Sequence, residues 1–193
     1  ETANDTLHYA LYDNEDNKIV ESMTIYSLDE EGLLIVDLVN QSEILIDPVT
    51  WAPISGKKLF YDNQQEVTIG TMISKDSVHA FMVVGEHMES KTIPVPSEPY
   101  LHNDQLLFTL PTLDFSQQKH MFQLFVPASA SFIPMAVIIE KPEQVDVPAG
   151  EFLSYPVTFD FGSATQKAWY EVAEPHRLII YDNGQIQYRL EKS

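Results

Sequence analysis

The C-terminal stretch from Gln144 to Ser193 alternates between short β-type segments and turn residues, and this pattern constrains the fold more than any other. The segments are rich in Val, Ile, Phe, Tyr and Trp, which favour strands, and Pro-Ala-Gly and Asn-Gly sequences separate them. Asn183-Gly184 lies between the last two segments and predicts a β-hairpin with a type I′ turn, because that turn needs positive φ at both central residues. The stretch therefore predicts an antiparallel meander.

Similar segments continue through the rest of the chain and predict an all-β fold. Strands are expected at Leu7–Tyr12, Lys18–Tyr26, Leu33–Val39, Lys57–Tyr61, Glu66–Ile73, Ser77–Val84, Lys119–Val126 and Phe132–Glu140. The pattern breaks between Gly85 and Gln118, where prolines are frequent and no alternation survives. Within this connection Asn103–Leu110 predicts one short helix, with Asn103 as its N-cap. The connection is expected to cover one face of the sheet, or alternatively to act as a functional lid.

We therefore expect a single β-barrel-like domain over residues 1–193, built from one strongly curved antiparallel sheet that forms a barrel or a half-barrel. The hydrophobic content of 44% is sufficient for its core. Because the chain has no cysteine, disulfides, thiolate catalysis and cysteine-based zinc sites are excluded. No apolar segment approaches the roughly 20 residues of a membrane-spanning helix.

Acidic residues dominate the charge of the chain. The 29 acidic and 11 basic residues give a formal net charge of −18. Nucleic acids and anionic lipid surfaces would be repelled, because both are bound mainly through Lys and Arg. We therefore expect no nucleic-acid partner.

The sequence begins at Glu1 without an initiator Met. This start fits a mature N-terminus left after removal of a signal peptide or lipid-anchor segment, although an arbitrary boundary explains it equally well.

No motif predicts catalysis, a cofactor or a metal. The six histidines are scattered, and none lies in a His-Glu-x-x-His sequence. Asp13–Asn17 superficially resembles a calcium loop, but Lys18 and Thr24 stand where that loop needs glycine and a bidentate acid. We therefore predict no catalytic residue, no cofactor and no bound metal.

One C-terminal cluster is a candidate ligand site. It comprises Trp169, Tyr170, Glu171, His176 and Arg177, which surround a proline turn and include one of only two arginines. Arg177 could hold an anion bidentately while Trp169 supplies an apolar wall. The structural alternative is that Glu171 or Glu174 pairs with Arg177 across the turn and Trp169 packs in the core.

Several motifs carry a resemblance to a known family. They are Val147–Phe152, Trp169-Tyr170, His176–Tyr181 and the earlier strand-turn Ile46–Pro53. In these motifs the chain resembles a family of exported bacterial proteins catalogued as a domain of unknown function, whose members look like lipocalin-like barrels or the half-barrels of lipoprotein carriers. The resemblance implies an exported protein of the cell envelope, periplasmic or at the cell surface, with a lipid anchor as one option. It implies no catalytic residue.

Three functions follow from this fold. The first is a non-enzymatic protein that binds a lipid or another apolar small molecule in a concave sheet, a function that flexible Met side chains would favour. The methionines considered are Met72, Met82, Met88, Met121 and Met135. The second is a protein-protein interaction module of the envelope. The third is a glycan-acting enzyme that uses paired carboxylates, for which 29 acidic residues offer many pairs.

Overall fold

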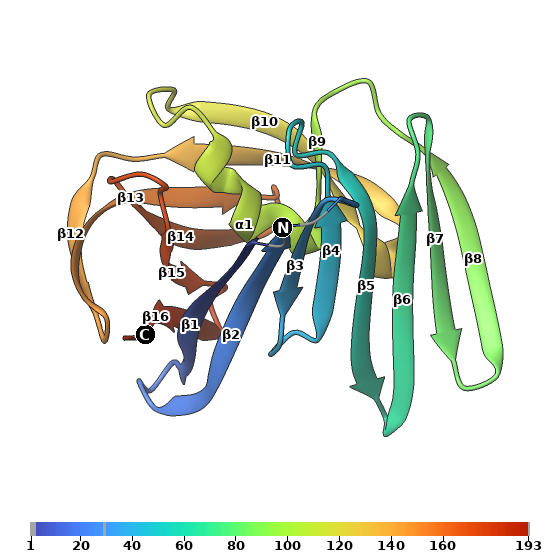
Figure 1. Cartoon of the computed structure of the whole chain (residues 1–193), viewed down its shortest axis with the longest axis horizontal. Helices are drawn as coiled ribbons and strands as arrows, with labels where there is room; N and C mark the ends of the chain where they lie inside the picture. Colours follow the sequence, from blue (N-terminus) through green and yellow to red (C-terminus); the bar gives the residue numbers. More distant parts are fainter. Residues whose placement is uncertain (1–2, 29, 193) are drawn as a thin grey trace. The chain divides into compact units, whose positions relative to one another are not determined.

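The computed structural model describes residues 3–28 and 30–192, and most of its regular structure is β-strand (Figure 1). The chain forms two compact units: unit 1 comprises residues 1–6, 24–106 and 123–133, and unit 2 comprises residues 7–23, 107–122 and 134–193. The single-domain organisation expected for residues 1–193 stays a prediction.

Unit 1 is built mainly from consecutive antiparallel hairpins, which lie side by side in Figure 1. Its strands are β3 (Leu33–Asp37), β4 (Ser42–Ile46), β5 (Pro53–Asp62), β6 (Gln65–Ile73), β7 (Ser77–Val84), β8 (His87–Pro94) and β9 (Tyr100–His102), with the 3₁₀ turns η1 (Asn103–Gln105) and η3 (Pro127–Ser129). One face of these strands is buried, since Ile44, Ile69 and Val78 are almost inaccessible to solvent.

Unit 2 contains the predicted C-terminal meander. Its strands are β12 (Glu143–Val147), β13 (Gly150–Asp160), β14 (Thr165–Glu171), β15 (Leu178–Asp182) and β16 (Ile186–Leu190), and it also holds most of helix α1 (Leu106–Thr109) and the 3₁₀ turn η2 (Leu110–Thr112). Consecutive strands from β13 to β16 pair in antiparallel fashion. Four further strands contribute residues to both units: β1 (Ala3–Asp13), β2 (Lys18–Leu28), β10 (Lys119–Val126) and β11 (Ser131–Ile139).

The strands form one hydrogen-bonded sheet. Its order is β8-β7-β6-β5-β4-β3-β2-β1-β16-β15-β14-β13-β11-β10-β9, and β12 pairs with β13. β9 and β10 run parallel, whereas the other pairs with a described register are antiparallel. Because β8 and β9 end this order and do not pair with each other in the part of the chain that is described, the sheet is not closed into a barrel. The prediction of an all-β fold with one short helix in the middle connection is confirmed. The sheet is open and is not the closed barrel that was one of the two expected forms.

One turn prediction needs correction. The hairpin at Asn183-Gly184 exists, but its loop has three residues, and only Gly184 has positive φ (87°). Asn183 instead accepts hydrogen bonds from Gln185 N and Ile186 N through its side-chain oxygen. The two-residue turn with positive φ at both positions lies at Asn63 and Gln64, between β5 and β6.

The long connection between Gly85 and Gln118 also differs from the prediction. It begins with β8, a strand that the sequence analysis missed because six consecutive residues, His87–Thr92, are exposed and show no apolar alternation. An edge strand with water on both faces has no such alternation to display. The connection then continues through β9 into η1.

His102, and not Asn103, caps the start of η1. Its Nδ1 accepts a hydrogen bond from Asp104 N (3.2 Å), and its Nε2 lies 3.1 Å from Thr71 Oγ1 on β6. Gln105 completes the cap, since its Oε1 accepts from His102 N (3.3 Å) and its Nε2 donates to the carbonyl of Trp51 (3.1 Å). Burial lowers the pKa of His102 to about 4, against a weaker opposing effect of the Asp104 carboxylate. A neutral histidine therefore ties the connection to β6.

Candidate functional site

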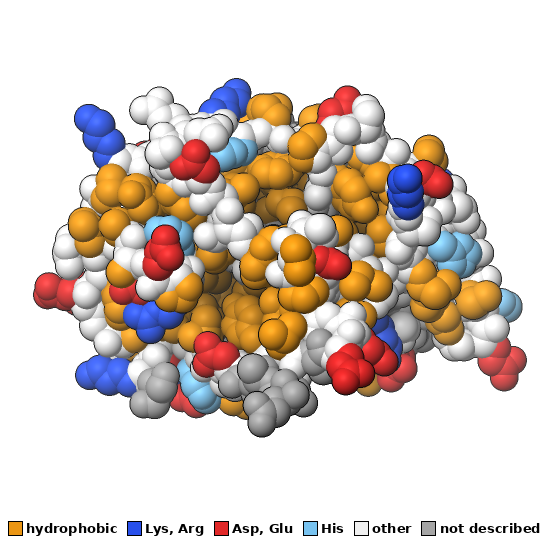
Figure 2. Space-filling model, turned by 45° about the horizontal axis from the view of Figure 1, so that its top comes forward, with side chains coloured by type: hydrophobic (Ala, Val, Ile, Leu, Met, Phe, Trp, Pro, Cys, Tyr) orange, Lys and Arg blue, Asp and Glu red, His pale blue; other side chains and the backbone are white. Residues whose placement is uncertain are grey.

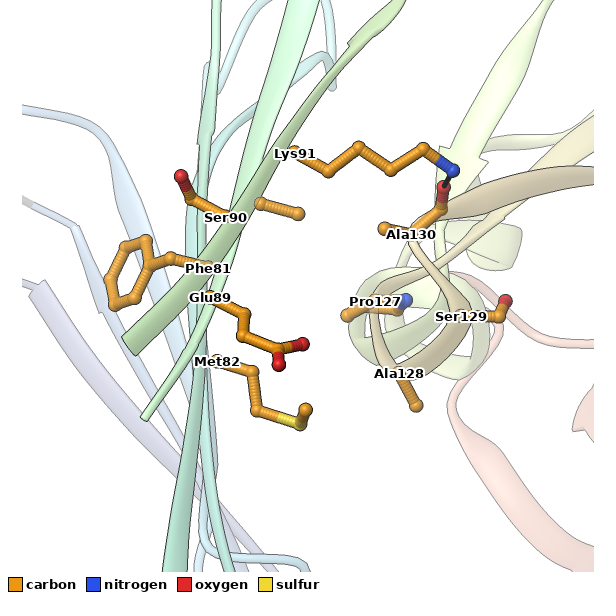
Figure 3. A pocket seen from close by; sticks show the side chains of 10 residues that line it. Phe81, Met82, Glu89, Ser90, Lys91, Pro127, Ala128, Ser129 and Ala130 are labelled. Atoms are coloured by element: carbon orange, nitrogen blue, oxygen red, sulfur yellow. Dashed lines mark hydrogen bonds between the residues drawn. The ribbon is translucent and has the colours of Figure 1, made fainter. Parts of the chain in front are cut away.

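A groove on unit 1 separates the β7–β8 hairpin from the η3 turn (Figure 3). Three segments that are distant in the sequence line it: Ala80, Phe81 and Met82 on β7; Glu89, Ser90 and Lys91 on β8; and Pro127, Ala128, Ser129 and Ala130 at η3. The cavity has a volume of about 340 Å³. This volume lies at the lower end of the range that small-molecule sites occupy.

Strand alternation decides which side chains face the groove. Ala80 pairs with Lys91 and Met82 pairs with Glu89, so these four side chains share one face of the hairpin. In Figure 3 the side chains of Met82, Glu89 and Lys91 extend toward η3, whereas Phe81 points away from it. β7 therefore contributes apolar groups to the groove, and β8 contributes charged groups.

The η3 turn forms the opposite wall. Pro127 occupies the first position of the turn, where its fixed φ is compatible and its missing N–H costs nothing. The turn ends at Ala130, whose φ of 45° is left-handed and whose N–H donates to the carbonyl of Pro127 (3.0 Å). Lys91 reaches across the groove, and its Nζ donates to the carbonyl of Ala130 (3.2 Å). This hydrogen bond joins the two walls.

An apolar cluster lies behind part of the groove. Ala80, which lines the groove, belongs to a buried cluster with Val78 and Phe125, against which Ala130 and Phe132 pack. The rings of Phe125 and Phe132 lie 5.1 Å apart. Ala80 and Ala130 thus connect the groove to a packed hydrophobic cluster, while the lining of the groove itself is both apolar and polar.

The two charges at the rim are not paired with each other. Among the described residues, neither Glu89 nor Lys91 takes part in an ion pair. Both side chains are exposed. A carboxylate and an ammonium group are therefore presented side by side, and both can accept a partner.

The predicted C-terminal cluster in unit 2 is partly assembled. Arg177 Nε donates to Glu171 Oε2 (2.8 Å), and His176 Nδ1 lies 2.9 Å from the carbonyl oxygen of Glu171. The guanidinium lies 5.6 Å from the ring centroid of Phe152, and the His176 ring lies 4.6 Å from that of Phe115. The structure thus brings Glu171, His176 and Arg177 together, and the pair of Glu171 with Arg177 is the one that the structural alternative described.

The other two members of that cluster point elsewhere. Tyr170 is fully buried, and its hydroxyl donates to the carbonyl of Leu107 (2.9 Å). The structural alternative placed Trp169 in the core, and this is wrong. Trp169 is half-buried, and its Nε1 donates to Glu143 Oε1 (2.7 Å) on β12. Ligand binding at this cluster stays a prediction.

No sequence pattern by itself indicated the groove. One signal pointed to it, since Met82 was among the methionines considered for an apolar ligand. Met135 is instead buried, and Met72, Met88 and Met121 are exposed.

Within the described residues, no helix has the length and apolar composition to cross a bilayer, and no three His, Cys, Asp or Glu side chains are grouped to hold a metal ion. On the face shown in Figure 2, hydrophobic side chains are visible at the surface between scattered acidic ones.

Comparison with known proteins informs the fold. The chain resembles the crystal structure of a β-barrel-like protein of the domain of unknown function DUF1849 from Brucella abortus, with a TM-score of 0.52 and 11% identity over 97% of this chain and 95% of that chain. This likeness shows a shared fold. A Bacteroides fragilis protein with a YmcC-like fold covers 97% of this chain and 93% of its own at 12% identity, but its TM-score of 0.29 is too low to support an argument. No family model and no curated protein matches the chain.

Proposed function

We propose that this chain is a non-enzymatic binding protein that holds an apolar small molecule or lipid in the groove between β7–β8 and η3. The observation that carries the proposal is the apolar part of the groove's lining, Ala80, Met82 and Pro127, which lies beside the charged side chains of Glu89 and Lys91. Met82 adds adaptability, because its unbranched side chain fits irregular apolar surfaces.

The lining of the groove supports binding in preference to catalysis. Its ten residues include a single carboxylate, Glu89, whereas glycoside hydrolysis needs two facing carboxyl groups. They include no histidine to activate Ser90 or Ser129 as a nucleophile. We therefore infer that the groove holds its ligand without transforming it.

Filling the groove should abolish binding. Ala128 lines the groove and is exposed, so Ala128→Trp is expected to occupy the cavity without disturbing the core. We expect the affinity for the neutral dye Nile red to fall at least about tenfold, a change of about 1.4 kcal/mol, in a fluorescence titration.

The matched control is Ala164→Trp, which adds the same side chain to the exposed turn after β13 in unit 2 and should leave dye binding unchanged. Native mass spectrometry of freshly purified protein gives an independent readout, in which we expect co-purified lipid to be lost in Ala128→Trp. A wild-type protein that is free of lipid and does not bind the dye would sink the proposal and favour an envelope interaction module.

An exported location, periplasmic or at the cell surface, is part of the proposal. It is supported by the resemblance of the C-terminal motifs to an exported family, and the high net negative charge favours solubility there. Fractionation of the cells that naturally produce the protein, with antibody detection, should place it in the envelope fractions. Recovery in the cytosol alone would contradict the location and leave the binding proposal standing.

A further inference from the structure

We propose that the ligand of the groove is a zwitterionic single-chain phospholipid, whose phosphate pairs with Lys91 and whose ammonium group pairs with Glu89. This inference rests on the proposed function and names its ligand class. The inference follows from the distribution of apolar and charged side chains in the groove. β7 and η3 supply apolar walls through Ala80, Met82 and Pro127, whereas β8 supplies both charges.

The two charges come from one strand and face the same groove. Glu89 and Lys91 are two residues apart on one strand and face the same side, so their Cα atoms are separated by roughly 6.5 Å. Both side chains are exposed, and the flexible Glu89 side chain can approach the ammonium group of a phosphoethanolamine or phosphocholine whose phosphate is bound at Lys91. Neither forms an ion pair with the other or with any other described residue, so a ligand would not have to break one.

Lys91 retains donors for a phosphate after its hydrogen bond to the protein. An ammonium group has three N–H donors, and one of them is used by the carbonyl of Ala130. That bond holds Nζ across the groove from β8, beside the η3 turn (Figure 3). The two remaining donors can bind phosphate oxygens without releasing the η3 turn.

The net charge of the chain argues against a purely anionic ligand. With a formal charge of −18, the protein repels anions at long range, and Lys91 is the one cationic residue among the ten that line the groove. Glu89 would also repel an anion bound at Lys91. A zwitterion has no net charge, avoids the long-range repulsion and gives Glu89 a partner.

Four lipids with the same lauroyl chain separate head-group recognition from chain binding: lysophosphatidylethanolamine, lysophosphatidylglycerol, laurate and monolauroylglycerol. Each would be used below its critical micelle concentration to displace Nile red from the wild-type protein. Because exposed ion pairs are individually weak, we expect the zwitterionic lipid to bind about fivefold more tightly than the other three. Raising the salt concentration from 0.05 M to 0.5 M should reduce this preference.

Two charge-removing variants assign the preference to residues. Lys91→Met keeps the apolar stem and Glu89→Gln keeps the shape, and each should reduce the preference to less than twofold. Lys75→Met and Glu98→Gln remove matching exposed charges of unit 1 that do not line the groove, and both should retain it.

Equal displacement by all four lipids, or tighter binding of an anionic one, would overturn the head-group assignment while leaving apolar binding intact. A preference that survives both Lys91→Met and Glu89→Gln would also overturn it. If no lipid and no dye binds, the proposed function fails together with this inference.

Discussion

Lowering the pH from about 6.5 to about 4 should cost the folded protein about 3 kcal/mol of unfolding free energy through His102 alone. Burial lowers the pKa of His102 from 6.5 to about 4, so within this window the unfolded chain binds a proton that the folded chain does not. Stability therefore increases with pH across the window. Well above this window His102 is neutral in both the folded and the unfolded protein, and well below it His102 is protonated in both. The contribution of His102 to the unfolding free energy therefore stays constant outside the window.

The structure explains why the folded protein resists this proton. The tautomer that satisfies both contacts of His102 carries its proton on Nε2, which donates to Thr71 Oγ1, and leaves Nδ1 as the acceptor for Asp104 N. Thr71 in turn donates to the carbonyl of Gly56 (3.3 Å). A second proton on His102 would remove the acceptor at Nδ1 and place a charge in the core.

The measurement is urea unfolding, followed by circular dichroism, of the wild type and of His102→Gln between pH 4 and pH 7.5. His102→Gln is expected to be less stable at neutral pH but lacks the titrating group, and the carboxylates that are distant from His102 contribute equally to both proteins. The difference between the two free energies should therefore shrink by about 3 kcal/mol as the pH falls. His87→Gln, which replaces an exposed histidine, should follow the wild type. Parallel curves for the wild type and His102→Gln would show that His102 does not titrate as the structure requires.

Truncation of Phe125 should destabilise the protein even more. Phe125 on β10 is 1% exposed, and its ring contacts His102 (5.7 Å between ring centroids) and Phe132 (5.1 Å). Removing a buried aromatic ring loses its transfer free energy and leaves a cavity, so Phe125→Ala is expected to cost about 3–5 kcal/mol. Urea unfolding at pH 7 measures this cost.

Phe125→Leu serves as the control, because it preserves most of the apolar volume and should cost about 1–1.5 kcal/mol. Phe122→Ala is a second control on the same strand, since Phe122 is only half-buried and should tolerate truncation better. A cost below about 1 kcal/mol for Phe125→Ala would mean that the buried cluster of Phe125, Val78 and Ala80 is not packed as described.

Local sequence patterns located most strands because propensity and alternation act over a few residues. Ser77–Val84 and Lys119–Val126 were predicted with the bounds that the structure shows. The pairing of Arg177 with Glu171 was also among the predicted alternatives, since a short turn brings residues six apart into reach. The Trp169 contact was not predictable in this way, because Glu143 reaches it only through the pairing of β12 with β13 and of β13 with β14.

Errors in the prediction fell where tertiary context overrides local preference. Asn183-Gly184 has the composition of a type I′ turn, yet the positive φ values at both turn positions occur at Asn63 and Gln64, because the register of β5 and β6 leaves only two residues to connect them. β8 carries no apolar alternation, and it is a strand because β7 provides a hydrogen-bonding partner along its full length.

The sequence by itself determined the all-β class, the C-terminal meander, the short helix of the middle connection and the absence of cysteine chemistry, since each depends on neighbouring residues or on composition. Only the tertiary structure decided that the sheet stays open and that a groove forms. The groove exists because long-range packing brings β7, β8 and η3 close together. Its lining comes from three separate segments, Ala80–Met82, Glu89–Lys91 and Pro127–Ala130. No pattern within a single segment indicates which distant segment will pack against it.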